Sequence, residues 1–187
     1  MEVKYADDGE TLLLNRWFGG DESALKTLVE RYKRIIFSLV LYLTGCSRDE
    51  AFVLTAAIFT KVIRSLRPLR LSQKDDFFLQ ELARTLIDQC PTISSTAAFD
   101  LSDFATLPAA KKESLRIVKE SLFALSFENK CLLLLRDQWN FSYDTMSAIL
   151  GLPVKEVRAK TFQARILLRD QTKEILDRKR SHHNGLR

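Results

Sequence analysis

Side chains suited to contacting nucleic acid gather in the C-terminal part of this 187-residue sequence. Positive and amide side chains recur there at short spacings: Lys155, Arg158, Lys160, Gln163, Arg165 and Arg169. Guanidinium and ammonium groups bind phosphate oxygens, and they also hydrogen-bond base edges in the major groove of DNA. Residues 155–187 hold ten Lys and Arg against four Asp and Glu, whereas residues 1–154 hold 19 against 20. The positive charge is therefore concentrated where a nucleic-acid contact would need it.

Two helices joined by a short turn are expected to position these side chains. Ser142 is a typical N-cap, Gly151 can end the first helix, and Pro153 suits the start of the second. Five residues of the second helix fall on one inward stripe: Val154, Val157, Thr161, Ala164 and Leu168. The spacing of a DNA-reading helix-turn-helix is also present. It consists of the small Ser147, then Gly151 four residues later, and then the apolar Val157 six residues after that. The spacing leaves one alternative open, an αα-hairpin whose charged face is only solvated.

Composition and motif content exclude several other classes of protein. The chain is 46% hydrophobic and 28% charged, and no apolar run is long enough to span a membrane. The acidic, polar N-terminus is unlike a signal peptide, so a cytoplasmic location is expected. Cys46, Cys90 and Cys131 are widely spaced, which favours buried thiols over a metal site. Without a glycine-rich phosphate loop, or a nucleophile with a plausible histidine base, we expect no enzymatic activity, no cofactor and no metal.

Helical periodicity and glycine punctuation predict an all-α protein with two small domains. The first domain, residues 1–90, is expected to hold three or four helices. Residues 91–110 are rich in Ser, Thr and Ala and contain no basic residue, which indicates a flexible linker. A second domain of four helices, including the helix-turn-helix, is expected over residues 111–177. Residues 178–187 are predicted to be a disordered basic tail.

The strongest helical segments of the first domain are 21–45, 51–66 and 75–90. Asp21 is expected to cap the first of these, and Ser47 with Glu50 to form a capping box before the second. The second segment is apolar over much of its circumference. Part of its surface is therefore expected to meet another protein or another domain.

The order of these features resembles the extracytoplasmic-function (ECF) sigma factors of bacterial RNA polymerase, in the minimal form with two folded domains. In the second domain the resemblance is carried by Ala124–Glu128, Leu132–Asp137, Ser142–Asp144, Ile149–Val154, Val157, Arg158, Lys160, Ala164 and Arg165. In the first domain it is carried by Gly20–Leu25 with Tyr32, Phe59–Arg64 and Ala83–Leu86.

The sequence also departs from this family in the first domain. The family's polar anchors for polymerase are replaced over Phe52–Ala57, and only Glu50 is retained. Phe78 stands where the family has a tryptophan, and Cys90 with Pro91 replaces basic residues. Polymerase binding and promoter melting are the functions that these changes would affect.

The resemblance implies two kinds of site. The first domain would bind the clamp of core RNA polymerase through Glu50, Leu54, Ile58, Phe59 and Val62. It would also hold the minus-ten element of promoter DNA on Arg64, Phe77, Phe78 and Arg84, together with Arg67 and Arg70. The linker, with Asp100 and Asp103, would thread toward the active cleft of the polymerase.

The second domain would read the minus-thirty-five element in the major groove. Arg158 and Lys160 are the expected contacts to bases, and Lys155, Arg165 and Arg169 are the expected contacts to phosphates, with Gln163 beside them. For Arg165 and Arg169 the alternative is solvation, or pairing with Asp170 and Glu174.

The function implied is that of a sigma factor with an anti-sigma factor as a further partner. The alternative, motivated by the losses at Phe52–Ala57, is a sigma-like protein that does not bind core polymerase. Such a protein would act as a DNA-binding regulator or as a decoy for an anti-sigma factor.

Overall fold

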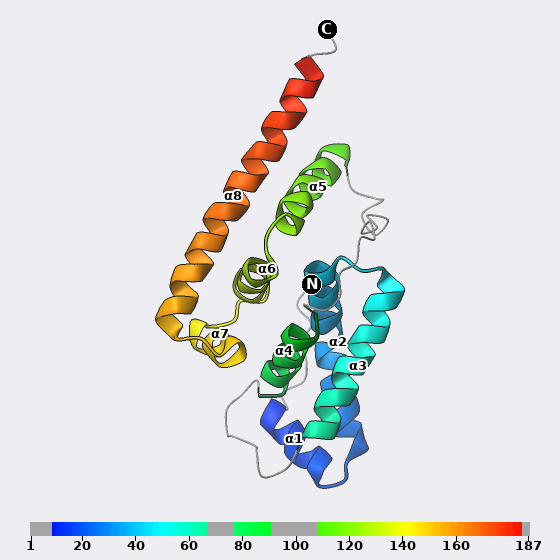
Figure 1. Ribbon diagram of the computed structural model, residues 1–187. Helices are drawn as coiled ribbons and strands as arrows, with labels where there is room; N and C mark the ends of the chain where they lie inside the picture. The colour runs from blue at the N-terminus through cyan, green and yellow to red at the C-terminus, as the bar shows by residue number, and fades with distance from the viewer. Residues whose placement is uncertain (1–8, 67–76, 91–107, 185–187) are drawn as a thin grey trace. The chain divides into compact units, whose positions relative to one another are not determined.

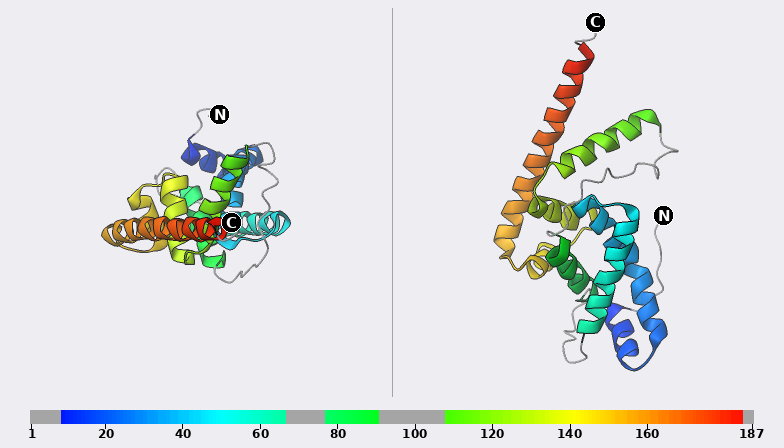
Figure 2. Two further views of the ribbon diagram at one scale, coloured as in Figure 1. Left: turned by 90° about the horizontal axis from the view of Figure 1, so that it is seen from above. Right: turned by 45° about the vertical axis from the view of Figure 1, so that its right-hand side comes forward.

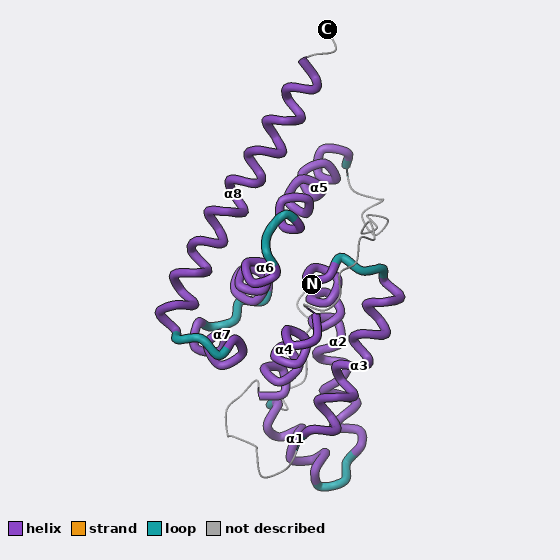
Figure 3. Tube along the Cα trace, in the orientation of Figure 1, coloured by secondary structure: helices purple, strands orange, loops and turns teal. Residues whose placement is uncertain are grey.

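The computed structural model describes residues 9–66, 77–90 and 108–184. The chain divides into two compact units, residues 1–94 and 95–187. Helices joined by short turns make up the described residues, and no strand occurs among them (Figures 1 and 3). The all-α prediction is therefore confirmed. Most of the predicted linker, together with Arg67 and Arg70, lies outside the described residues.

The first unit contains α1 (Glu10–Phe18), α2 (Glu22–Thr44), α3 (Arg48–Ser65) and α4 (Phe77–Gln89). The long helix α2 is central, because α1, α3 and α4 all pack against it. Its apolar side chains recur every three or four residues and therefore form one buried stripe. The fully buried large side chains of this unit are Leu13, Leu14, Leu28, Ile36, Leu39, Ile58, Phe78, Leu82 and Leu86.

The predicted caps of α2 and α3 are present. The Asp21 carboxylate accepts a hydrogen bond from the backbone N–H of Ser23 at 2.9 Å, and Gly45 ends α2 with φ 70°. Ser47 accepts from the N–H of Glu50, and the Glu50 carboxylate accepts from the N–H of Ser47 at 2.8 Å. These bonds satisfy backbone donors that the first turn of each helix leaves unpaired.

Three or four helices were predicted for this domain, but the position of helix α1 was not, and this helix supplies a buried carboxylate to the core. Glu10 is only 4% exposed. It accepts a hydrogen bond from the Tyr32 hydroxyl at 2.7 Å and another from the backbone N–H of Phe78 at 2.6 Å. Because the three residues belong to α1, α2 and α4, one carboxylate ties three helices together. Burial, and then the charge of Glu10, raises the pKa of Tyr32 above its ordinary value.

The second unit contains α5 (Ala109–Phe123), α6 (Phe127–Leu133), the π-helix η4 (Leu134–Gln138), α7 (Tyr143–Leu150) and α8 (Val154–Asn184). Helix α8 has 31 residues and packs against α7, α6 and α5 in turn. Figure 2 shows this long helix from two further directions. The four predicted helices are present, with a π-helical turn added after α6.

The end of α8 differs from the prediction of a disordered tail over residues 178–187, because the helix continues to Asn184, and residues 185–187 of that tail lie outside the described residues. Contacts along and across the helix explain the difference. Arg178 pairs with Glu174 one turn earlier at 2.7 Å, and Lys179 reaches across to Glu113 of α5 at 2.6 Å. The sequence composition of the tail did not reveal this second contact, since its partner lies 66 residues away.

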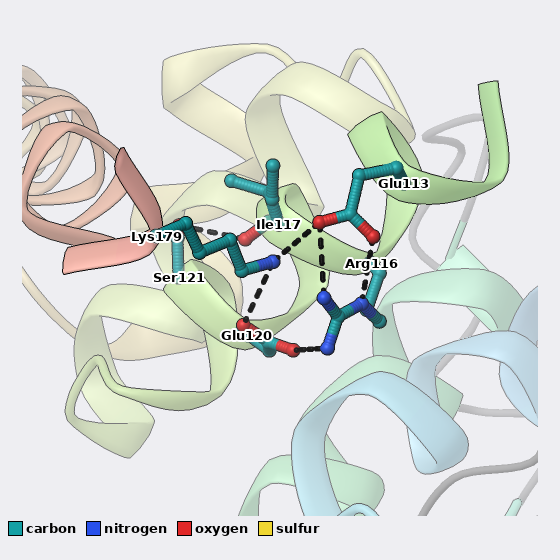
Figure 4. A network of polar contacts seen from close by, with 6 residues as sticks. All are labelled: Glu113, Arg116, Ile117, Glu120, Ser121 and Lys179. Atoms are coloured by element: carbon teal, nitrogen blue, oxygen red, sulfur yellow. Dashed lines mark hydrogen bonds and ion pairs between the residues drawn. The ribbon is translucent and has the colours of Figure 1, made fainter. Parts of the chain in front are cut away.

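The contact between α5 and α8 is a network of four charged side chains (Figure 4). Arg116 donates to Glu113 at 2.9 Å and to Glu120 at 3.1 Å, while Lys179 lies 2.6 Å from Glu113 and 3.8 Å from Glu120. The hydrogen bonds from Arg116, and then from Lys179, lower the pKa of Glu113 to about 2. This network holds the C-terminal half of α8 against α5.

Candidate nucleic-acid interface and partner groove

The turn between α7 and α8 is closed by local hydrogen bonds. Ser142 accepts from the N–H of Thr145 at 3.0 Å, as expected of the N-cap of α7. Gly151 ends α7 in the left-handed conformation with φ 67°, and its N–H donates to the carbonyl of Ser147. The Ser147 hydroxyl donates to the carbonyl of Leu152 at 2.5 Å. The two helices and the turn predicted for residues 142–154 are therefore present.

One face of α8 is buried and another carries exposed positive charge. Of the predicted stripe, Val157, Thr161 and Ala164 are fully buried, whereas Val154 and Leu168 are half-buried. At about 100° per residue, four cationic side chains follow one another along a single exposed flank. We call this flank the cationic stripe, and it consists of Lys155, Arg158, Arg165 and Arg169.

Two of the predicted contacts lie away from the cationic stripe. The directions of Lys160 and Gln163 are about 140–160° around the helix from that of Arg158. Lys160 pairs with Glu128 of α6 at 2.6 Å and with Glu156 at 3.3 Å, and these carboxylates raise its pKa. Lys160 is thus engaged in joining α8 to α6, whereas the sequence predicted a contact to bases.

An exposed aromatic side chain interrupts the cationic stripe. Phe162 is 64% exposed and lies on the same flank as Arg158 and Arg169. Sequence reasoning did not select it. The available signal was its position, since an aromatic residue five positions after Val157 falls outside the apolar stripe.

The arginines of the cationic stripe have partners within their own unit. Arg165 donates two hydrogen bonds to Asp137 of the π-helix, which raises its pKa. Arg169 pairs with its neighbour Asp170 at 2.9 Å, so one of the two pairings considered for it is confirmed. The Arg158 guanidinium lies 5.2 Å from the ring centroid of Tyr143, the first residue of α7. Exposed pairs of this kind contribute little to stability and can exchange with a ligand.

In the first unit, the structure corrects the expected role of Phe78. Its side chain is 0% exposed, so it cannot stack on a base. It packs instead between Tyr32 and Phe59, with ring centroids 6.1 and 6.2 Å away. Phe77 is half-buried at the start of α4.

The expected arginines of the first unit remain at its surface. Arg64 is exposed near the end of α3. Arg84 is partly buried and pairs with Glu81 one turn earlier at 2.7 Å.

The expected polymerase contacts on α3 also require correction. Ile58, Phe59 and Val62 belong to the core of the first unit and are at most 6% exposed. They lie on the inner face of α3, because residues 58, 59 and 62 share the spacing of its buried stripe. Leu54 is half-buried, and the Glu50 carboxylate is occupied by the capping box. The side chains that α3 leaves exposed are different ones.

An apolar groove lies on the outer side of α2 and α3. Its volume is about 400 Å³. Its apolar walls include Val29, Phe37, Phe52, Ala56 and Phe59, so one of the expected polymerase contacts lines it, and Lys33 and Arg34 lie along it. Phe52 is 70% exposed, and its neighbour Val53 is 65% exposed but does not line the groove. This confirms that α3 has more apolar surface than its own core covers.

Other kinds of site find no support in the described residues. Cys46, Cys90 and Cys131 are buried free thiols, as predicted, and burial raises the pKa of Cys90 to about 12. Within the described ranges no group of His, Cys, Asp and Glu side chains is arranged to hold a metal ion. Among the described helices, none has the length and apolarity required to cross a membrane.

Comparison with known proteins gives a likeness in fold. No family model and no curated protein matches the sequence. The structure is similar to that of CnrH, solved in complex with the cytosolic domain of CnrY, with a TM-score of 0.65. The match covers 91% of this chain and 98% of the CnrH chain at 20% sequence identity. The likeness shows that this chain shares the fold of CnrH.

Proposed function

We propose that this chain is a sigma factor of the ECF type, which directs promoter-specific initiation by binding core RNA polymerase and promoter DNA. The observation that carries the proposal is the cationic stripe of α8, which a closed turn holds clear of the core. The fold shared with CnrH supports it. A sigma factor contributes no covalent chemistry of its own, and its place of action is the cytoplasm.

The second unit would read DNA through α8 in the major groove. Arg158 lies one turn from the start of the helix, where recognition helices contact base edges. Lys155, Arg165 and Arg169 flank it at spacings suited to phosphates. The exposed ring of Phe162 would contact a thymine methyl group, which is the apolar feature of the major groove.

The first unit would supply polymerase binding and contacts to the minus-ten element. We assign the polymerase contact to the apolar groove, since its exposed Phe52 can insert into a partner surface and Lys33 and Arg34 can pair with acidic residues there. The remaining minus-ten candidates are Arg64, Phe77 and Arg84. In this assignment, apolar contacts with polymerase take the place of the polar contacts that the family makes at the positions of Phe52–Ala57.

Selection from a pool of random DNA duplexes tests the second unit. The full-length protein should enrich one sequence, and Arg158→Ala should weaken binding to that duplex by about 5- to 150-fold, which corresponds to roughly 1–3 kcal/mol. Gln163→Ala is the matched control, because it removes a polar side chain from the opposite flank of the same helix. Equal effects of the two substitutions would contradict reading through the cationic stripe.

Co-migration with bacterial core RNA polymerase on a sizing column tests the first unit. Phe52→Asp should abolish co-migration, whereas Val53→Asp should preserve it. The two residues are neighbours with similar exposure, and only Phe52 lines the groove. Run-off transcription by core polymerase mixed with the protein should likewise be lost with Phe52→Asp and kept with Val53→Asp. The proposal would be contradicted if an active core polymerase did not bind the protein and produced no run-off transcript with it.

One alternative is favoured by the surface of α3. The side chains that this helix exposes over Phe52–Ala57 are apolar, and Glu50 is used for capping. A sigma-like protein that has lost core binding would have this surface, and it would act as a DNA-binding regulator or as a decoy for an anti-sigma factor. An anti-sigma factor is a proposed partner in either case, because CnrH was solved with the cytosolic domain of CnrY. DNA selection without co-migration would favour this alternative.

A further inference from the structure

We infer that Tyr143 is a positioning residue, which holds the Arg158 side chain ready for contact with a base. The inference rests on the proposed function of α8 and adds a residue outside that helix. Tyr143 is the first residue of α7, and its ring lies 5.2 Å from the Arg158 guanidinium. At this distance the electron-rich ring face attracts the cation.

A second arginine also lies against the ring. The Arg136 guanidinium lies 4.6 Å from the centroid of Tyr143. Arg136 is itself anchored, since its Nη1 donates to the carbonyl of Phe141 at 2.6 Å. The ring is therefore bound by one arginine that has a structural partner and by another that belongs to the cationic stripe.

The π-helix η4 explains how these groups come together. Its wider turn is closed by the N–H of Trp139, which donates to the carbonyl of Leu134 at 3.0 Å. Two successive side chains of this turn make contacts near the cationic stripe. Arg136 approaches Tyr143, and Asp137 binds Arg165. Single π-helical turns within helices occur frequently at functional sites.

The arrangement acts on two arginines of the cationic stripe at once. Asp137, and to a smaller extent Tyr143, raises the pKa of Arg165, while Tyr143 holds Arg158. A long arginine side chain loses rotamer freedom when it binds, and this loss opposes binding. A side chain already held near its binding position loses less. Tyr143 would therefore increase affinity without touching DNA.

A spectroscopic measurement on the DNA-free protein tests the positioning. The ring current of Tyr143 should shift the side-chain NMR resonances of Arg158. Tyr143→Phe keeps the ring and should keep the shift, whereas Tyr143→Leu should abolish it. Thermal unfolding of both variants checks that each is folded. Arg158 resonances that are unchanged in the folded Leu variant would overturn the positioning role.

Affinity for the selected duplex tests the consequence for DNA. Tyr143→Leu should weaken binding roughly two- to fivefold, and Tyr143→Phe, which keeps the ring but loses the hydroxyl bonded to Arg165, should weaken it less. In an Arg158→Ala background, Tyr143→Leu should have a smaller effect, because only the interaction of Tyr143 with Arg165 is then left to lose. An undiminished effect in that background would overturn the inference. Failure to select any duplex would overturn the proposed function, whereas the Arg158 resonances would still decide whether the ring positions this side chain.

Discussion

The two units use polar side chains in opposite ways. In the first unit the principal polar cluster is internal, since buried Glu10 joins α1, α2 and α4 through Tyr32 and Phe78. In the second unit the principal clusters lie on the surface, where Asp137 binds Arg165 and Glu113 binds Lys179. The outer surface of the first unit is correspondingly apolar around Phe52.

This difference indicates two modes of recognition. A buried carboxylate with two donors is costly to disturb, because any change leaves a polar group unpaired inside the core. Exposed ion pairs are weak and exchange easily with charged ligands. The first unit is therefore suited to binding a partner through a rigid apolar surface. The second unit is suited to binding a charged ligand, which would take the place of the carboxylates that pair with its cationic side chains. Three substitutions would break or sharpen this comparison.

The largest effect is expected at Glu10. Glu10→Ala removes the acceptor of two buried hydrogen bonds and should lower the unfolding free energy by about 2–4 kcal/mol. Urea unfolding followed by the fluorescence of Trp17, in a Trp139→Phe background, measures this in the first unit. Tyr32→Phe removes only one of the two bonds, so its effect should be smaller. A stable Glu10→Ala variant would show that the carboxylate does not join the three helices.

An intermediate effect is expected at Gly151 in the turn before α8. No atom lies within 4 Å of the position that a Cβ would take, so the only obstacle is the φ of 67°. Gly151→Ala should cost about 1–2 kcal/mol in unfolding free energy. Gly151→Asn should cost less, because asparagine tolerates the left-handed conformation better. Chemical unfolding followed by Trp139 fluorescence, in a Trp17→Phe background, would compare the variants, and equal losses would contradict a purely conformational cause.

The smallest effect is expected at Glu113. Its pKa is lowered to about 2 by Arg116 and Lys179, so the stabilisation that it provides is present above its ordinary pKa near 4.5. That stabilisation is lost as the pH falls toward 2. The midpoint of thermal unfolding should decrease over this range, and Glu113→Gln should reduce the decrease. Because the group is exposed, about 1 M salt should also reduce it. A decrease of the same size in the variant would exclude Glu113 as its source.

The capping residues could be predicted from the sequence because caps depend on local chemistry. Asp21, Ser47, Ser142 and Gly151 act on backbone groups within a few positions of themselves, so their residue types were sufficient. The identity of the core residues on α3 was harder to predict. That helix is apolar on several sides, and only packing decides that Phe59 is buried while Phe52 is exposed.

Long-range partners explain the remaining errors at the site. The cationic side chains of α8 could be predicted from residue type and spacing, but their ion-pair partners could not. Lys160 meets Glu128, and Arg165 meets Asp137, across separations of 32 and 28 residues. Nothing in the local pattern around α8 specifies these pairs. The same holds for Tyr143, which was selected as part of a motif and not as a contact of Arg158.

The length of α8 has a mechanical consequence. The helix runs without interruption from the turn at Gly151 to Asn184, which is about 46 Å. Its first turns carry Arg158, and its last turns carry Lys179, which is tied to α5. Because the helix is continuous, its C-terminal half on α5 and its first turns share one direction. The packing of α8 against α5, to which the exposed charged network adds little, therefore sets the angle of the turns that carry Arg158 within the second unit.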